Sequence, residues 1–396
     1  MPNLLVKLKM EEKFTNYIKN RKKICFVLQS HYKYRLGGAE LQAYFIAREL
    51  YKTGWEVHYV FDKSGILQRG FDDGLILHNL RDYGYLHCFL NYFSLQKKLR
   101  EIDPDIIYQR MGFAYTGAVA RFAKTYNKKF VWATSHVKDC EKKRFISSLK
   151  EYDGNLLKKF LLAIEYGIHD YLCDYGIKNA NVIVVQDKEQ KDSLAKNWGV
   201  GSTIIKNGHL VPTKLPQKEN PPIVLWLASL KRLKQAEKFI KLARQCKELN
   251  CKFILAGRSS DKGYLEELLQ QMQGLLNIEY VRGVTFEESN RLIGHAGVFV
   301  NTSKYEGFPN TFIQAWMRET PTVSLSVDPD DVIKKNKLGF HSGSFEQMVK
   351  DVRFLVQNKR VREETGRNAR KYAIREHDFG KIAPKYIELI EKMVKK

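Results

Sequence analysis

The sequence is poor in the features of secreted and membrane-spanning proteins. Its cysteines form no CxxC pair and no cluster with histidine, so we expect neither a disulfide framework nor a zinc site. The N-terminus lacks the continuous apolar segment of a secretory signal peptide. No run of about 18 apolar residues occurs, so no transmembrane helix is expected. We therefore expect a cytoplasmic protein with mostly buried, reduced thiols. The six cysteines are at positions 25, 88, 140, 173, 246 and 251.

Acidic residues are also scarce. The 396 residues include 44 Asp and Glu against 67 Lys and Arg, and the formal net charge is +23. Such a balance favours anionic partners, which include nucleotides, nucleic acid and an acidic membrane surface. The charge is spread along the chain and no RNP, KH or zinc pattern occurs, so a nucleic-acid partner is not expected. A nucleic-acid-binding protein remains an alternative on the net charge alone.

Two phosphate-binding fingerprints are missing as well. Neither the dinucleotide pattern G-x-G-x-x-G nor the P-loop lysine pattern occurs. The chain instead alternates apolar, strand-like runs with helical segments, which indicates parallel sheets covered by helices on both faces. We predict strands at 23–29, 56–62, 105–110, 129–136, 181–187, 223–229, 252–257, 278–283, 298–303 and 322–326, and helices at 40–54, 235–249, 261–274, 286–296 and 311–318.

A polar stretch rich in Pro and Gly separates two such alternating series, so we predict a linker between two domains. The basic N-terminal arm could be a membrane-surface helix, or a helix packed on the protein or a frayed arm. The predicted parts are the arm at 1–22, an N-terminal Rossmann-like domain at 23–206, the linker at 207–222, a C-terminal Rossmann-like domain at 223–378, and a C-terminal helix at 379–396, for which packing back on the N-terminal domain is an open option.

The strongest candidate site is the turn SKYEGFPN, in which Glu306 stands between a buried strand and a predicted helix. Open α/β sheets bind ligands at the carboxyl ends of their strands, and helix N-termini favour phosphate. Gln314 lies about two helical turns after Glu306, on roughly the same face. A carboxylate and an amide placed in this way could hold the hydroxyls of a ribose or a hexose. The alternative is an ordinary helix N-cap on the surface.

Other strand ends carry weaker signals. Gly37 and Gly38 precede a helix and would let backbone N–H groups approach a phosphate, although a plain tight turn is equally compatible. His136 ends an apolar strand, where it is either a site residue or a surface histidine. The charged segment 138–159 could form a mobile loop over a cleft between the two predicted domains, or a solvated helix face. The acidic run 328–331 could clamp a metal, but a turn before a helix is favoured because no His or Glu accompanies it.

A basic loop follows the first strand of the second series. Ser229, Lys231, Arg232 and Lys234 provide donors and positive charge at a strand end, and could hold a diphosphate. A basic, solvated turn is the alternative.

In order and content, these parts resemble glycosyltransferase family 4, whose members are retaining, nucleotide-sugar-dependent enzymes of the GT-B fold. The likeness covers most of residues 23–380. It includes GGAE in the first loop, the strand ending in His136, the segment from VIVVQD to NGHLVP, the basic loop at 229–234 and the E-G-F-P-N turn, of which only the last is specific by itself. The resemblance implies an α/β protein with two doubly wound, Rossmann-like domains that face each other across a cleft. It implies that the N-terminal domain, 23–206, binds the acceptor and that the C-terminal domain, 223–378, binds the nucleotide-sugar.

The resemblance also implies roles for single residues. Glu306 matches the first acid of the family's two-acid motif and would orient the hydroxyls of the donor sugar. Gln314 replaces the second acid, which is expected to bind ribose. Lys234 matches the diphosphate lysine, and Ser229 replaces the arginine usual five residues earlier, so that Lys231 or Arg232 would supply the missing charge. Gly38 is similar to the glycine that approaches the diphosphate, and His136 resembles the histidine that contacts the donor sugar.

The complete set of predicted site residues is catalytic Glu306, His136 and Lys234; donor-binding Gly37, Gly38, Ser229, Lys231, Arg232, Gly307, Phe308, Pro309, Asn310 and Gln314; and acceptor-binding Tyr34, Arg35, Gln109 and Arg110. No metal or other cofactor is expected, because the nucleotide-sugar is a substrate and basic groups would stabilise the leaving diphosphate.

The implied function is transfer of a sugar from a UDP- or GDP-sugar to a glycan or lipid-linked acceptor, in the synthesis of a cell-surface polysaccharide or glycolipid. A lipid-linked acceptor would place the protein peripherally at the inner face of the plasma membrane, where its positive charge meets anionic lipid. A catalytically silent GT-B protein that binds a nucleotide or a glycan remains an alternative, favoured by Gln314 and Ser229.

Overall fold

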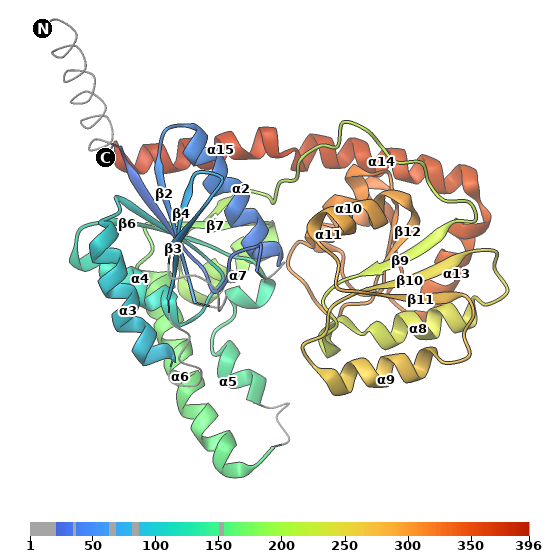
Figure 1. Ribbon diagram of the computed structural model, residues 1–396, viewed down its shortest axis with the longest axis horizontal. Coiled ribbons are helices and arrows are strands. Elements are labelled where there is room, and N and C mark those ends of the chain that lie inside the picture. The colour runs from blue at the N-terminus through green and yellow to red at the C-terminus, as the bar shows by residue number, and fades with distance from the viewer. Residues whose placement is uncertain (1–20, 35–36, 63–68, 81–86, 150–153, 396) are drawn as a thin grey trace, which may run out of the picture. The chain divides into compact units, whose positions relative to one another are not determined.

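The computed structural model of the chain describes residues 21–34, 37–62, 69–80, 87–149 and 154–395. Its contacts divide the chain into two compact units, shown in Figure 1. Unit 1 comprises Met1–Val185, Gln190–Thr203 and Ala383–Lys396, and unit 2 comprises Gln186–Glu189 and Ile204–Ile382. The predicted N-terminal arm, up to residue 20, lies outside the described residues.

Unit 1 contains an eight-stranded sheet with the order β3-β4-β2-β1-β5-β6-β7-β8. The apolar runs of β1, β5 and β6 are buried, as expected for strands covered on both faces. Strand β3 runs antiparallel to β4, whereas β4, β2, β1, β5, β6 and β7 pair in parallel. The strands are β1 Lys23–Val27, β2 Glu56–Phe61, β3 Arg69–Asp72, β4 Leu75–Asn79, β5 Ile106–Arg110, β6 Lys129–Ala133, β7 Val182–Val185 and β8 Thr203–Ile204.

Helices connect these strands. The 3-10 helix η2 and helices α5 and α6 all lie between β6 and β7, where the sequence predicted either a loop or a solvated helix face. The helices are α2 Gly38–Lys52, α3 His87–Ile102, α4 Ala114–Thr125, η2 Val137–Cys140, α5 Arg144–Ser148, α6 Leu156–Lys178 and α7 Lys188–Trp198.

Unit 2 contains a six-stranded, fully parallel sheet with the order β11-β10-β9-β12-β13-β14. Numbered from the first strand of the unit, this is the order 3-2-1-4-5-6 of doubly wound nucleotide-binding folds. The order reverses between β9 and β12, and such a switch point is where these sheets bind their ligands. The strands are β9 Ile223–Leu227, β10 Lys252–Gly257, β11 Ile278–Arg282, β12 Ala296–Asn301, β13 Thr322–Ser324 and β14 Gly339–His341.

Helices cover both faces of this second sheet. Helices α8, α9 and α13 contribute to one buried apolar cluster, and α10, α11 and α14 contribute to the other. The predicted fold class, two doubly wound α/β domains, is confirmed. The helical elements are η4 Arg232–Lys234, α8 Ala236–Gln245, α9 Lys262–Met272, α10 Phe286–His295, α11 Asn310–Met317, η5 Pro329–Asp331, α12 Val332–Asn336, α13 Phe345–Gln357 and α14 Lys359–His377. The last helix, α15 Phe379–Val394, belongs to unit 1 from Ala383 onward.

Local signals explain where several of these helices begin. Asp261 accepts a hydrogen bond from Tyr264 N at 3.0 Å and caps α9. Thr285 and Glu288 form a capping box at the start of α10, with hydrogen bonds of 2.7 and 3.1 Å. The Asp328 carboxylate accepts from Ile333 N at 2.8 Å, so the acidic run 328–331 forms the turn that was favoured before α12.

Candidate functional site

The turn that carries Glu306 lies between β12 and α11, at the switch point of the unit 2 sheet. Glu306 Oε1 lies 2.6 Å from Lys234 Nζ and accepts hydrogen bonds from Ser303 Oγ at 2.7 Å and Asn301 Nδ2 at 3.2 Å. The side chains of Lys234 and Glu306 are 17% and 15% exposed, so the pair is largely shielded from water. The structure therefore brings together two of the predicted catalytic residues.

The electrostatic balance at Glu306 favours the ionised form. Burial by itself raises the pKa of the Glu306 carboxyl, but the Lys234 ammonium and the hydrogen bonds from Ser303 and Asn301 outweigh it and hold this pKa below its usual value. Glu306 is therefore a carboxylate at neutral pH, an acceptor of hydrogen bonds suited to sugar hydroxyls.

Thr302 joins the loops on either side of the switch point. Its hydroxyl donates to the backbone oxygens of Lys234 and Gln235 at 2.7 and 2.9 Å and accepts from Trp226 Nε1 at 2.8 Å. The backbone N–H of Lys304 also donates to Leu233 O, at 3.1 Å. These bonds fix the loop after β9 against the turn after β12, and so fix the relative position of Lys234 and Glu306.

The E-G-F-P-N turn is supported from behind by residues that the sequence analysis did not single out. Gln186 Oε1 accepts from the backbone N–H of Phe308 at 3.2 Å and from Asn207 Nδ2 at 3.2 Å. His209 Nε2 lies 3.0 Å from Asn310 Oδ1. All are buried except Asn310, which is partly exposed. The only sequence signal for them is that polar side chains occur within the apolar segments VIVVQD and IIKNGHLVP.

His209 is held in its neutral form. Burial lowers its pKa to about 4, and the hydrogen bond with Asn310 opposes this only in part. A neutral His209 with its proton on Nε2 donates to Asn310 Oδ1. Asn310 begins α11, so this contact positions the helix start that follows the Glu306 turn.

Gln314 lies in the middle of α11 and is buried. Its Nε2 donates to Asn290 Oδ1 of α10 at 3.0 Å. This side-chain hydrogen bond is directed to the neighbouring helix and not to Glu306, and the contact of Gln314 with ribose stays a prediction. Gly307, Phe308 and Pro309 complete the turn, and Phe308 is buried in the core cluster beneath it.

The basic side chains of the loop after β9 point in two directions. Lys234 points to Glu306, whereas the Arg232 guanidinium forms two bonds to the Glu267 carboxylate of α9, of 3.0 and 2.6 Å, and lies over the ring of Tyr264. Ser229 and Lys231 are exposed on the same loop. Arg232 is thus already ion-paired on the surface, and whether it or Lys231 replaces the missing arginine stays a prediction.

In unit 1, the predicted glycines lie at the start of α2. Gly37 is its N-cap residue and Gly38 its first residue. A Cβ atom on Gly37 would lie 2.1 Å from Glu40 Oε2, so a larger residue there would displace the end of that side chain. Tyr34 follows β1 and packs near His31 and Phe61. Arg35, predicted to bind the acceptor, lies outside the described residues.

The other two predicted acceptor residues are buried at the end of β5. Gln109 donates from Nε2 to Met111 O at 3.0 Å. Arg110 is 1% exposed, and its guanidinium lies 3.4 Å from the Tyr108 hydroxyl. Their acceptor-binding role stays a prediction, although the structure places their side chains inside unit 1 rather than on its surface.

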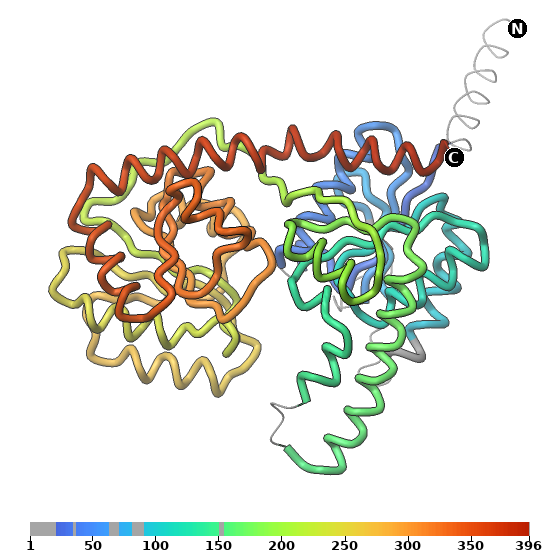
Figure 2. Tube along the Cα trace, turned by 180° about the vertical axis from the view of Figure 1, so that it is seen from behind, coloured from blue at the N-terminus to red at the C-terminus, as the bar shows by residue number. Residues whose placement is uncertain are grey.

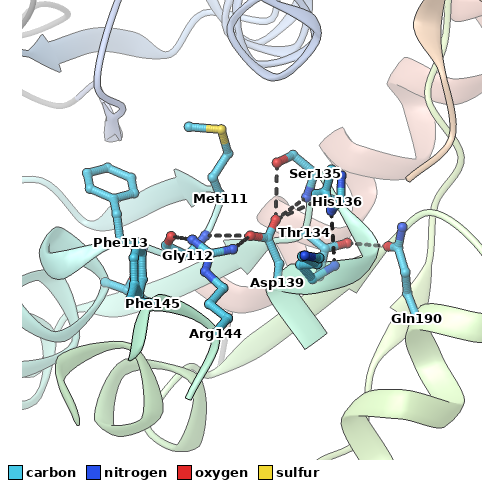
Figure 3. Close-up of polar contacts among 12 residues, drawn as sticks. Met111, Gly112, Phe113, Thr134, Ser135, His136, Asp139, Arg144, Phe145 and Gln190 are labelled. Carbon is cyan, nitrogen blue, oxygen red and sulfur yellow. Dashed lines mark hydrogen bonds and ion pairs between the residues drawn. The ribbon is translucent and has the colours of Figure 1, made fainter. Parts of the chain in front are cut away.

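His136 is held by the loop that follows β6. Its Nδ1 accepts from the backbone N–H of Lys138 at 3.0 Å, so the neutral ring carries its proton on Nε2. The Asp139 carboxylate accepts from the backbone N–H groups of His136 and Ser135, at 3.1 and 2.8 Å. Figure 3 shows this carboxylate at the centre of the cluster. The predicted donor-contacting histidine is thus oriented by a buried acid.

The same carboxylate connects three segments. Asp139 Oδ1 accepts from Gly112 N at 3.3 Å and forms an ion pair with Arg144, whose guanidinium also donates to Gly112 O. Burial by itself raises the pKa of Asp139, but Arg144 and the backbone N–H of Ser135 hold it below its usual value. Asp139 therefore ties the ends of β5 and β6 to the start of α5. The sequence analysis treated it only as part of a charged segment.

The described residues also bear on cysteine pairing, metal-ligand clusters and apolar helices. The five described cysteines are free and buried, as expected; the side chain of Cys88 lies outside the description. In the described parts of the chain, no three His, Cys, Asp or Glu side chains gather as metal ligands would. None of the described helices has the length and apolar character needed to cross a bilayer.

Two family models together match most of the chain. The model described as Glycosyltransferase Family 4 matches residues 36–209, and the model described as Glycosyl transferases group 1 matches residues 211–372. The first match contains the Gly37, His136 and Asn207 segments, and the second contains Lys234 and Glu306.

Two curated proteins are similar in sequence. An uncharacterised glycosyltransferase of Methanocaldococcus jannaschii is 25% identical over 259 residues, which cover 59% of this chain and 58% of that protein. A poly(ribitol-phosphate) alpha-N-acetylglucosaminyltransferase of Staphylococcus aureus is 24% identical over 225 residues, which cover 54% of this chain and 45% of that protein. The chain thus spans about half the length of these relatives.

Solved structures share the fold over almost the whole chain. Sucrose-phosphate synthase from Thermosynechococcus elongatus has a TM-score of 0.74 at 15% identity and covers 94% of this chain and 99% of its own. The Anabaena protein HepE, solved in complex with UDP-glucose, has a TM-score of 0.69 at 14% identity and covers 93% and 99%. At these identities the likeness concerns the fold alone.

Proposed function

The chain belongs to glycosyltransferase family 4, and on that basis we propose that it is a retaining enzyme that transfers a hexose from a UDP- or GDP-sugar to a glycan or lipid-linked acceptor. The observation that carries the proposal is the Lys234–Glu306 pair at the switch point of the unit 2 sheet. A cation for the diphosphate and a carboxylate for the sugar hydroxyls stand side by side, where a doubly wound sheet binds its ligand.

The chemical roles follow from charge. As the bond between the anomeric carbon and the diphosphate breaks, negative charge grows on the leaving phosphate. The Lys234 ammonium stabilises this charge, an electrostatic effect worth several kcal/mol in a water-poor site. Glu306 holds the sugar hydroxyls in place, and its carboxylate is fixed by Ser303 and Asn301. The acceptor hydroxyl then attacks the anomeric carbon from the face that the diphosphate leaves and gives its proton to the departing phosphate oxygen. The nucleoside diphosphate is released and the anomeric configuration is retained.

His136 contributes from unit 1 in this proposal. Its Nδ1 accepts from the backbone N–H of Lys138, so the neutral ring carries its proton on Nε2, and we assign this N–H to a hydroxyl of the donor sugar. Asp139 acts only through the loop and is a positioning residue. No metal or other cofactor is proposed, since Lys234 and the backbone N–H groups of the turn would stabilise the diphosphate.

The acceptor is proposed from the charge and from the relatives. The Staphylococcus aureus relative is named for a poly(ribitol-phosphate) acceptor, which is an anionic polymer. The formal net charge of +23 fits an anionic acceptor of this kind, or a lipid-linked diphosphate sugar. We therefore place the protein in cell-surface polysaccharide or glycolipid synthesis, in the cytoplasm with peripheral contact to the inner face of the plasma membrane.

The test is a thermal-shift screen against UDP, GDP, ADP and CMP, followed by their sugars. A ligand at 100 times its Kd adds about 2.7 kcal/mol to the free energy of unfolding. A clear shift with one nucleoside diphosphate, followed by sugar transfer with the matching donor, would support the proposal. No shift and no turnover with any of these donors would contradict it.

A catalytically silent nucleotide- or glycan-binding protein is the second candidate. The buried Gln314 amide is engaged with Asn290, and the Arg232 guanidinium is engaged with Glu267. Both side chains therefore bind protein partners, although the resemblance predicts that groups at these positions bind the nucleotide-sugar donor. Nucleotide binding without turnover would favour this candidate.

A further inference from the structure

The first half of α6 exposes an apolar surface that the proposed chemistry does not use. Exposed fractions are 82% for Leu156, 69% for Leu157, 63% for Phe160, 58% for Leu161 and 50% for Ile164. These residues recur at helical spacing. Solvent-exposed single apolar residues are ordinary, but five within three turns form a patch that requires a partner. We call these five residues the α6 tip.

The α6 tip extends beyond the part of the helix that packs on unit 1. The buried residues of α6 are His169, Asp170, Cys173, Gly176 and Ile177, all in its second half. There the helix lies close against α4, because a Cβ atom on Gly176 would be 2.5 Å from the backbone of Thr116. In Figures 1 and 2, α5 and the first half of α6 project from the sheet of unit 1 as a hairpin.

The hairpin is a built feature rather than a frayed end. The Asp170 carboxylate accepts from the backbone N–H groups of Phe145 and Ile146, at 3.1 and 3.0 Å, and so caps α5. The ring of Phe145 lies against Tyr166 and His169. Asn155 caps α6 by accepting from Leu157 N at 2.8 Å. The α6 tip is therefore presented on a fixed helix.

The charges within the tip segment are positive. Residues 154–164, GNLLKKFLLAI, contain Lys158 and Lys159 as their only charged residues, and in the sequence Asp153 precedes the segment and Glu165 follows it. An apolar face beside lysines is the composition that binds anionic bilayers, because the apolar side chains enter the boundary of the acyl chains while the ammonium groups meet the headgroups.

The apolar and charged side chains of this segment lie on opposite sides of the helix. Leu156, Phe160 and Ile164 recur every fourth residue, and Leu157 and Leu161 lie beside them, so the five residues form one stripe about 140° wide. Lys158 and Lys159 lie on the side away from that stripe. An apolar stripe opposed by lysines is the pattern of a helix that lies in the interface of an anionic bilayer.

We propose that the α6 tip is a membrane-docking element that inserts into the interface of an anionic phospholipid bilayer. The inference rests on the proposed function in its lipid-linked form, because it explains how the enzyme reaches an acceptor embedded in the bilayer. Docking through α6 would hold unit 1, which contains His136, at the membrane. The hairpin of α5 and α6 is joined to the His136 loop, because Arg144 at the start of α5 is ion-paired with Asp139.

The test is flotation of the purified full chain with vesicles of phosphatidylcholine alone, and with vesicles that also contain phosphatidylglycerol. The wild type should float with the anionic vesicles only. Phe160→Glu should weaken this binding at least about tenfold, because it replaces an inserted ring with a charge that the headgroups repel. The double variant Lys158→Glu, Lys159→Glu should weaken it by at least about 25-fold, at about fivefold for each lysine lost.

Phe93→Glu is the matched control, because Phe93 is 69% exposed on α3 of the same unit and lies outside the tip. It should float like the wild type. Equal loss in Phe93→Glu and Phe160→Glu would overturn the proposal, as would no flotation of the wild type. Sedimentation showing a dimer that Phe160→Glu converts to a monomer would assign the tip to a second copy instead.

Nucleotide thermal shifts measured on the same variants separate this proposal from the proposed function. If Phe160→Glu loses vesicle binding and keeps its nucleotide shift, both proposals stand. If the wild type binds nucleotide but no vesicle, the docking proposal fails and the donor side of the proposed function remains.

Discussion

Lys234 Nζ lies 2.6 Å from Glu306 Oε1, in a pair that joins the loops after β9 and β12. The two strands are neighbours in the sheet although they are far apart in the chain. The ion pair gives the switch point a charge-balanced centre, where a diphosphate would compete for the ammonium group while sugar hydroxyls donate to the carboxylate. This relationship is the basis of the first prediction.

Lys234→Ala and Glu306→Ala should each reduce sugar transfer at least about 100-fold, because each removes about 3 kcal/mol of transition-state stabilisation. The measurement is kcat/KM with the donor found in the nucleotide screen. Lys252→Ala is the control, since Lys252 forms an exposed ion pair with Glu279 at the opposite end of the strands. Wild-type rates in either site variant would remove the role assigned to that residue.

Gln314→Glu should retain transfer and bind the donor more tightly. The change restores the acid expected at this position, and the Asn290 amide can turn to donate from Nδ2 to the new carboxylate. Calorimetric titration with the donor or its nucleotide measures the affinity. Complete loss of activity with an intact fold would show that the amide itself is required.

Chelation should leave the rate unchanged. In the proposed mechanism the leaving diphosphate is stabilised by Lys234 and backbone N–H groups, so transfer in EDTA should match transfer in added Mg²⁺. Initial rates in the two buffers are the measurement. A strict requirement for Mg²⁺ would contradict the metal-free mechanism.

Asp139→Asn should destabilise unit 1 by roughly 3 kcal/mol, because it leaves the Arg144 guanidinium partly buried without its counter-charge. Urea unfolding measures this loss. If Asp139 also positions His136, kcat should fall while the thermal shift with free nucleotide persists, since Lys234 and Glu306 belong to the other unit.

The double variant Asp139→Asn, Arg144→Gln is the control for that substitution. It removes both charges, so it should recover part of the stability lost by Asp139→Asn alone. Strictly additive losses in the two single variants would show that the ion pair contributes nothing beyond its separate hydrogen bonds.

Stability should fall as the pH drops from about 6.5 towards 4. Burial lowers the pKa of His209 to about 4 and that of His377 to about 3, from an ordinary value of 6.5. Below pH 6.5 these histidines become protonated in the unfolded chain but stay neutral in the folded chain, which favours unfolding. By about pH 5, each histidine therefore lowers the free energy of unfolding by on the order of 2 kcal/mol.

His209→Gln keeps a donor for Asn310 and removes the titration. Urea unfolding at several pH values should therefore show a shallower dependence in this variant than in the wild type. Identical slopes would show that His209 titrates alike in the folded and unfolded chain, contrary to the effect of its burial.

Much of unit 2 could be predicted because its signals are local. The helices expected at 286–296 and 311–318 are present as α10 and α11 within one residue, owing to a capping box in one case and a Pro turn in the other. For the segment 138–159 and helix α6, local sequence signals did not decide between a loop and a helix. The apolar residues of α6 include both buried and exposed positions, so their periodicity does not distinguish a core face from an exposed one.

The sequence by itself determined the alternation of strands and helices, the Gly/Pro turn that carries Glu306 and the basic loop that carries Lys234, because apolar periodicity and turn residues act over a few neighbouring positions. Tertiary structure alone decided that Lys234 pairs with Glu306, that Gln186, Asn207 and His209 support the turn, and that Asp139 holds the His136 loop. Each of these depends on which strands become neighbours and which distant side chains meet in a buried space, where the energy of a charge or hydrogen bond is set by its partners. The exposed α6 tip belongs to the same class, since only the packed fold shows which apolar side chains the protein itself does not cover.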